Sequence, residues 1–296
     1  MKTTTITTAL AAVAVSLAAA ACGGSGTSRS AAAPTTTTVT SPTTTTTAGE
    51  RRSDPIDELV TVSAGRLHVR CTGTGDVTVL LISGWGFGSE AWAVVEPTIA
   101  ERARVCTYDR FGTGTSDSPP ETQTFDTEAA DLHELLDEIG ESGPFFAVGH
   151  SFGGAEAVTF ASTYADEVDG LMLVDASPTT WPDAVCSVPA YAGGCALMRD
   201  PTQHAEQLDV FPAFERVATI TTLGDLPMTV LTAAHRSGDG LRPDELTRLE
   251  TIWRDGTERW AQLSTASNVV TVEDTGHVIQ VDQPTVVIDE LLKLFP

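Results

Sequence analysis

Short apolar runs, each ended by a turn and followed by a segment suited to a helix, recur along this chain from about residue 54 onward. A short continuous apolar run is typical of a strand buried on both faces of a mostly parallel sheet. Such runs cover residues 77–82, 104–108, 145–148, 171–174, 228–231 and 269–272, after an alternating hairpin at 60–62 and 67–71. Helices are expected at 127–139, 155–161 and 284–294. The alternation predicts an α/β fold with a mostly parallel central sheet flanked by helices.

One strand-to-helix turn carries the sequence Gly149-His150-Ser151-Phe152-Gly153. This is the Gly-x-Ser-x-Gly pattern, in which a sharp turn holds the serine in a strained conformation at the start of a helix. Glycines suit the two flanking positions, because side chains there would collide in so tight a turn. The turn would present Ser151 as a nucleophile at the top of the sheet and aim the backbone N–H of Phe152 at a developing oxyanion.

From about residue 60 to its C-terminus, the chain resembles the α/β-hydrolases, and within them the serine esterases and lipases. Besides the serine turn, residues 83–86 stand where that family carries His-Gly-x-x, with Ser83 in place of the histidine. The resemblance implies that this loop supplies the second oxyanion donor, here the backbone N–H of Trp85. Residues 108–116 resemble the family's loop after the following strand, and we interpret that loop as scaffold.

The resemblance also implies a late histidine as the general base and a carboxylate that orients it. His277 follows the last expected strand, whereas His150 adjoins the nucleophile and is expected to point away from it. The acid should lie between serine and histidine in the chain. Asp239 comes late after the strand that usually carries it, and Asp175 ends the preceding strand, a position that some family members use. Catalytic groups gather at that edge of an open sheet, which favours Asp175 over Asp239.

These roles imply acyl transfer through an acyl-enzyme, with a small-molecule or lipid carboxylic ester as the default substrate. Peptidase, thioesterase, lactonase and carbon–carbon bond hydrolase activities stay open. No metal or organic cofactor is implied. A serine at the turn disfavours epoxide hydrolase and haloalkane dehalogenase chemistry, because the related enzymes carry aspartate there. The alternative is a non-catalytic envelope-binding module, favoured by Ser83 and by the missing acid at its usual position.

The N-terminal segment reads as an export signal. Lys2, an apolar run at 9–18 and small residues up to position 21 describe a signal peptide over residues 1–21. Small residues before Cys22 resemble a bacterial lipobox, although Ala19 stands where leucine is usual. We expect a cell-envelope lipoprotein lipidated at Cys22 and held by an N-terminal lipid anchor; the alternative is a secreted protein. Residues 22–53 are then a Thr/Pro-rich disordered linker, and the hydrolase domain covers 54–296.

The remaining cysteines number four, an even count in an exported chain. Cys186 and Cys195 bracket a short glycine-containing loop and are expected to pair, which leaves Cys71 for Cys106. Free buried thiols are the alternative. The hydrolase resemblance makes the strands of Cys71 and Cys106 neighbours, which is consistent with a bridge between them.

The charge balance is strongly acidic, with 17 basic against 40 acidic residues and a net charge of -23. Such a chain is repelled by nucleic acid and by anionic lipid surfaces, so neither is an expected partner. The residues from about 178 to 226 follow no clear pattern and contain several aromatic side chains. We expect them to form a cap over the carboxyl edge of the sheet.

Overall fold

The computed structural model describes residues 54–234 and 241–296. The expected signal peptide, the lipidation site Cys22, the whole of the linker and the candidate acid Asp239 lie outside these residues. Within the described ranges, no helix combines the length and the apolar character that crossing a membrane requires.

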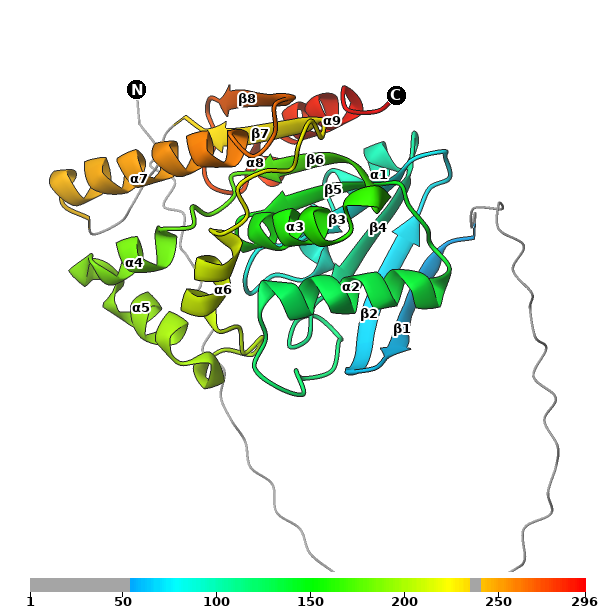
Figure 1. Ribbon diagram of the computed structural model, residues 1–296, viewed down its shortest axis with the longest axis horizontal. Coiled ribbons are helices and arrows are strands. Elements are labelled where there is room, and N and C mark those ends of the chain that lie inside the picture. Colours follow the sequence, from blue (N-terminus) through cyan, green and yellow to red (C-terminus); the bar gives the residue numbers. More distant parts are fainter. Residues whose placement is uncertain (1–53, 235–240) are drawn as a thin grey trace, which may run out of the picture. The chain divides into compact units, whose positions relative to one another are not determined.

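An eight-stranded sheet in the order β1-β2-β4-β3-β5-β6-β7-β8 forms the centre of the fold (Figure 1). Its strands are β1 (Ile56–Val62), β2 (Gly65–Thr72), β3 (Thr78–Ile82), β4 (Arg104–Asp109), β5 (Phe145–His150), β6 (Val168–Val174), β7 (Met228–Ala233) and β8 (Ser267–Val272). Strands β1, β2 and β4 pair antiparallel, and all pairs from β4 to β8 are parallel. The expected α/β-hydrolase architecture is confirmed, and every expected strand is present at or within a few residues of its predicted position.

Helices bury both faces of this sheet. One apolar core lies beneath α2 (Phe125–Ile139), α3 (Phe152–Thr163) and α6 (Val210–Val217). A second core on the other face includes side chains of α1 (Glu96–Ile99), α8 (Ile279–Asp282) and α9 (Pro284–Leu292). Two-sided burial explains why β3, β4 and β5 are buried at every residue and therefore show no alternation in sequence.

Two helices differ from the sequence expectation. Helix α3 begins at Phe152, three residues earlier than predicted, because the sharp turn at Ser151 sends the chain directly into the helix despite two glycines. The long helix α7 (Pro243–Ala261) was not predicted; its mean hydropathy is low, and only one stripe, including Leu249, Trp253 and Trp260, is buried.

The segment expected as the cap lies between β6 and β7 and contains α4 (Trp181–Cys186), α5 (Ala192–Arg199) and α6. In Figure 1, α4 and α5 lie beyond the end of the sheet where the parallel strands finish. A disulfide bond joins Cys186 at the end of α4 to Cys195 in α5, and another joins Cys71 to Cys106, which face each other across β2 and β4. These are the two pairings expected from the sequence, and the first one ties the cap helices together.

Candidate active site

The turn between β5 and α3 has the strained geometry that its sequence predicts. Ser151 has a φ of 56° and a ψ of -122°, a conformation that residues with a side chain rarely adopt. A Cβ atom at Gly149 would lie 2.2 Å from the carbonyl oxygen of Gly153, and one at Gly153 would lie 2.3 Å from that of Ser83. Only glycine fits at both positions, so the turn holds Ser151 at the N-terminus of α3.

Three side chains from separate strand ends form a hydrogen-bonded row. The Nε2 atom of His277, which follows β8, lies 2.9 Å from Ser151 Oγ. Its Nδ1 atom lies 2.6 Å from Asp175 Oδ2, directly after β6. Asp175 is fully buried, whereas the His277 side chain is 40% exposed and can meet a substrate. The structure therefore brings together the three residues favoured from the sequence.

The Asp175 carboxylate is held from the neighbouring strand and from α7. Its other oxygen, Oδ1, accepts a hydrogen bond of 3.1 Å from the backbone N–H of Ala233, the last residue of β7. A second bond of 3.1 Å comes from the indole Nε1–H of Trp253. Hydrogen bonds to a carboxylate stabilise its charged form, which offsets part of the cost of burying it. Trp253 was missed from the sequence, because nothing local links a tryptophan on α7 to an aspartate in another segment.

His150 holds the backbone of His277, a contact that was not predicted from the sequence. Its Nε2–H donates to the backbone carbonyl of His277 at 3.0 Å, and the two rings lie 4.8 Å apart. Burial, with a further contribution from the nearby His277, lowers the pKa of His150 to about 3. A histidine that stays neutral at physiological pH can hold the loop of His277 without placing a second positive charge beside it.

A second buried serine lies beside the first. Ser177 Oγ is 3.3 Å from Ser151 Oγ, and the Ser177 N–H donates to the Ser151 carbonyl at 3.1 Å. The sequence places Ser177 just after Asp175, but only the folded chain shows that it contacts the nucleophile.

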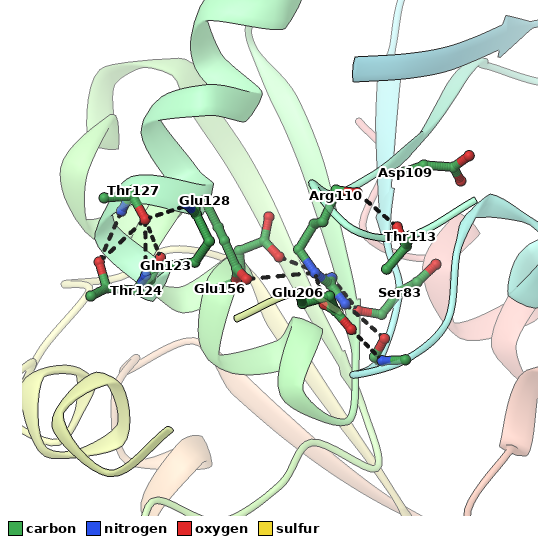
Figure 2. Close-up of polar contacts among 12 residues, drawn as sticks. Ser83, Asp109, Arg110, Thr113, Gln123, Thr124, Thr127, Glu128, Glu156 and Glu206 are labelled. Atoms are coloured by element: carbon green, nitrogen blue, oxygen red, sulfur yellow. Dashed lines mark hydrogen bonds and ion pairs between the residues drawn. The ribbon is translucent and has the colours of Figure 1, made fainter. Parts of the chain in front are cut away.

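Trp85 and Phe152, whose backbone N–H groups are the expected oxyanion donors, both line a space beside Ser151. Among the described residues, no acceptor takes a hydrogen bond from the N–H of Phe152 or of Trp85. In place of the family's histidine, Ser83 donates from its hydroxyl to the Gly88 carbonyl at 2.7 Å and closes the loop onto itself. Arg110, from the loop interpreted as scaffold, donates to the carbonyls of Ser83 and Gly84, each at 2.7 Å (Figure 2).

Two chambers open beside Ser151 and His277. One has a volume of about 490 Å³, with Trp85, Phe87, Phe152, Val185, Gly194 and Met198 among its lining residues. The other has about 240 Å³ and is lined by Leu241, Leu246, Leu249 and Trp253, among others. Trp181 and Tyr191 contribute to both. The described residues lining these chambers include no lysine, arginine, aspartate or glutamate, so the space suits uncharged groups.

Comparison with known proteins agrees with this geometry. The family model described as alpha/beta hydrolase fold matches residues 77–236. The chain belongs to the α/β-hydrolase fold family.

Its relatives include several kinds of hydrolase. It is 27% identical over 274 residues to a soluble epoxide hydrolase of Corynebacterium sp. (strain C12), covering 79% of this chain and 95% of that protein. It is 34% identical over 114 residues to a pimeloyl-acyl-carrier-protein methyl ester esterase of Sodalis glossinidius, covering 38% and 41%. The structure of a thermophilic esterase from Thermogutta terrifontis aligns with a TM-score of 0.57 at 22% identity, covering 81% of this chain and 97% of that one. The two sequence relatives support a hydrolase, and the solved structure supports the fold.

Proposed function

We propose that this protein is a serine hydrolase that cleaves carboxylic esters through an acyl-enzyme. The observation that carries the proposal is the position of His277, which bridges the strained Ser151 and the buried Asp175 with one ring nitrogen on each. A nucleophile, a base within hydrogen-bond reach and a third group that orients the base make up a functional triad.

In the first half of the reaction, Ser151 Oγ attacks the ester carbonyl while His277 Nε2 takes its proton. Asp175 keeps the proton of His277 on Nδ1 and stabilises the imidazolium that forms. The N–H groups of Phe152 and Trp85 donate to the tetrahedral oxyanion. When the intermediate collapses, His277 returns the proton to the departing alcohol, and the acyl group remains on Ser151.

In the second half, His277 takes a proton from water as the water oxygen attacks the acyl carbonyl. Collapse of the second intermediate releases the carboxylic acid, and the proton passes back to Ser151. The chain's own groups carry each of these steps. The two chambers beside Ser151 have no lysine, arginine, aspartate or glutamate among their described lining residues, which favours an uncharged ester.

A fluorophosphonate probe tests this proposal, because it reacts readily with an activated serine. We expect the purified wild-type protein to be labelled on Ser151 and to hydrolyse short-chain esters. Ser151→Ala and His277→Ala should show neither reaction. Ser267→Ala, at the start of β8, is the control and should behave as wild type. A folded wild-type protein that resists both probe and esters would contradict the proposal and favour a binding module.

Epoxide hydrolysis is the second candidate, because the chain resembles the Corynebacterium enzyme over most of its length. The serine at position 151 argues against it, since the epoxide hydrolases of this fold carry an aspartate at the turn. Offering styrene oxide and a p-nitrophenyl ester to the same preparation separates the two activities.

We also propose that the protein is exported and anchored to the cell envelope by a lipid on Cys22. The support is the apolar N-terminal run with small residues before that cysteine. Detergent partitioning and mass spectrometry of the mature N-terminus, compared with Cys22→Ser, test this. A mature chain that starts at another residue would contradict it.

A further inference from the structure

A short stretch of the cap lies directly against the loop that carries Trp85. The ring of His204 lies 4.1 Å from the ring of Trp85. One carboxylate oxygen of Glu206, Oε1, accepts the backbone N–H of Gly86. Ala205 packs closely on Gly112: a Cβ atom added to Gly112 would lie 2.1 Å from the Ala205 carbonyl oxygen. The cap therefore touches this loop at both Trp85 and Gly86.

The other oxygen of Glu206 reaches Arg110. Oε2 accepts the Nε–H of Arg110 at 2.8 Å, while the two Nη atoms of Arg110 donate to the carbonyls of Ser83 and Gly84. Figure 2 shows the guanidinium between Glu206 and Ser83. Arg110 and Glu206 are both buried, with side-chain exposures of 5% and 1%. One cap carboxylate thus contacts the loop directly and also through Arg110.

These bonds fix the orientation of the proposed oxyanion donor. A peptide unit is planar and trans, so its C=O and N–H point in opposite directions. The carbonyl of Gly84 and the N–H of Trp85 belong to one such unit. The Gly84 carbonyl accepts Arg110 at 2.7 Å and the N–H of Phe87 at 3.2 Å, and these two bonds together turn the Trp85 N–H the opposite way. The bond from Gly86 N–H to Glu206 fixes the next peptide unit in the same manner.

Arg110 lies among three buried carboxylates, one of which is Glu206. Glu156 of α3 lies 3.2 Å from Nη1, and Glu128 of α2 lies 3.7 Å from Nε. Burial raises the pKa of Glu128 well above its usual range, and it also raises the pKa of Glu156. Glu206 is the nearest of these carboxylates and the one that comes from the cap.

We propose that Glu206 is a positioning residue that couples the seating of the cap to the oxyanion hole. It acts through Arg110 and Gly86 rather than on the substrate. If the cap lifts away, Glu206 leaves with it, and both Arg110 and the Gly86 N–H lose the partner that helps to orient the Trp85 peptide. This inference rests on the proposed serine hydrolase activity.

The variant Glu206→Gln tests this inference. Glutamine has one acceptor oxygen, whereas Glu206 uses two, so the bond from Gly86 or the bond from Arg110 must be lost. The matched control is Glu141→Gln, another buried glutamate paired with an arginine, Arg104, at the opposite end of β4. Each variant is measured with a trifluoromethyl ketone, which forms an oxyanion on Ser151, and with the methyl ketone of the same chain, which reports ground-state binding. Ester hydrolysis gives kcat and KM.

We expect Glu206→Gln to lose roughly tenfold or more in kcat and in affinity for the trifluoromethyl ketone, since one oxyanion donor is worth about 10² to 10³ in kcat. The KM and the affinity for the methyl ketone should stay within about twofold, a difference near the 0.5 kcal/mol scatter of neutral substitutions. Glu141→Gln should keep both affinities. If Glu206→Gln does not fold, Glu206→Asp, which keeps the charge but is one methylene shorter, takes its place.

Three results would overturn the inference: equal losses for both ketones, no loss for either, or the same selective loss in Glu141→Gln. Failure of the proposed function looks different, because wild-type protein would then resist the fluorophosphonate and bind the trifluoromethyl ketone no better than the methyl ketone.

Discussion

The strongest test of the active site is Asp175→Asn, because the surroundings of Asp175 dictate which way the new amide must point. The Oδ1 side receives two donors, the N–H of Ala233 and the indole N–H of Trp253. An asparagine must therefore place its carbonyl oxygen there and turn its NH2 group toward His277 Nδ1. That nitrogen then becomes an acceptor, and the proton of the neutral ring moves to Nε2.

The wrong tautomer removes the base from Ser151 while leaving the geometry intact. With its proton on Nε2, His277 donates toward Ser151 Oγ and cannot take the serine proton. Loss of this kind in a serine triad lowers kcat by a factor on the order of 10⁴, or about 5.4 kcal/mol in the activation barrier. The free energy of unfolding should change much less, because the amide is the same size as the carboxylate and keeps the same two donors.

Two assays check this expectation: kcat/KM for a p-nitrophenyl ester and the second-order rate constant for fluorophosphonate labelling. Both should fall together, and the methyl ketone should bind with unchanged affinity. Asp239→Asn is the control and should retain wild-type activity. Retention of a tenth or more of the activity in Asp175→Asn would refute the reasoning, and a large loss in Asp239→Asn would move the acid to that residue.

Further predictions concern the surroundings of this triad. Trp253→Phe removes one hydrogen bond to a buried carboxylate, worth about 1.5–3 kcal/mol, so kcat/KM should fall roughly tenfold or more; an unchanged value would show that the bond from Trp253 is not needed. Gly194→Leu fills the larger chamber, where a Cβ atom would meet Val185 at 3.8 Å, so long-chain esters should lose activity while acetate esters keep it. Equal losses across an acyl-length series would contradict this. Because burial lowers the pKa of His150 from 6.5 to about 3, the unfolded chain binds a proton between these values that the folded chain does not. The free energy of unfolding should therefore fall as the pH drops from 6.5 toward 3. Urea unfolding at pH 7 and pH 4.5 should show a smaller change in this free energy for His150→Gln than for wild type.

Local sequence was sufficient for the serine turn and for the order of the strands in the chain. The turn could be predicted because two glycines, a serine and a buried strand stand next to one another in the sequence, so the constraint is a short-range one. The same holds for apolar runs buried on both faces. Helix α7 was not predicted from the sequence, because its buried stripe is narrow and its other side chains are mostly charged.

The candidate site was only partly predictable. Ser151 and His277 follow from their places after particular strands, and Asp175 could be favoured over Asp239 because it ends a strand at the carboxyl edge. Trp253 and Glu206 could not be found in this way, since each meets its partner across many residues of chain: Trp253 lies 78 positions from Asp175, and Glu206 lies 120 from Gly86.

The sequence by itself thus determined which residues are candidates for the chemistry, because the geometry of the serine turn depends on neighbours along the chain. Only the tertiary structure decided how those residues are held. The Asp175 carboxylate is stabilised from β7 and α7, and the peptide unit of Trp85 is oriented by Arg110 and the cap. The physical reason is that burial leaves polar groups dependent on partners from whatever segments pack nearby, and that packing is set by the whole fold.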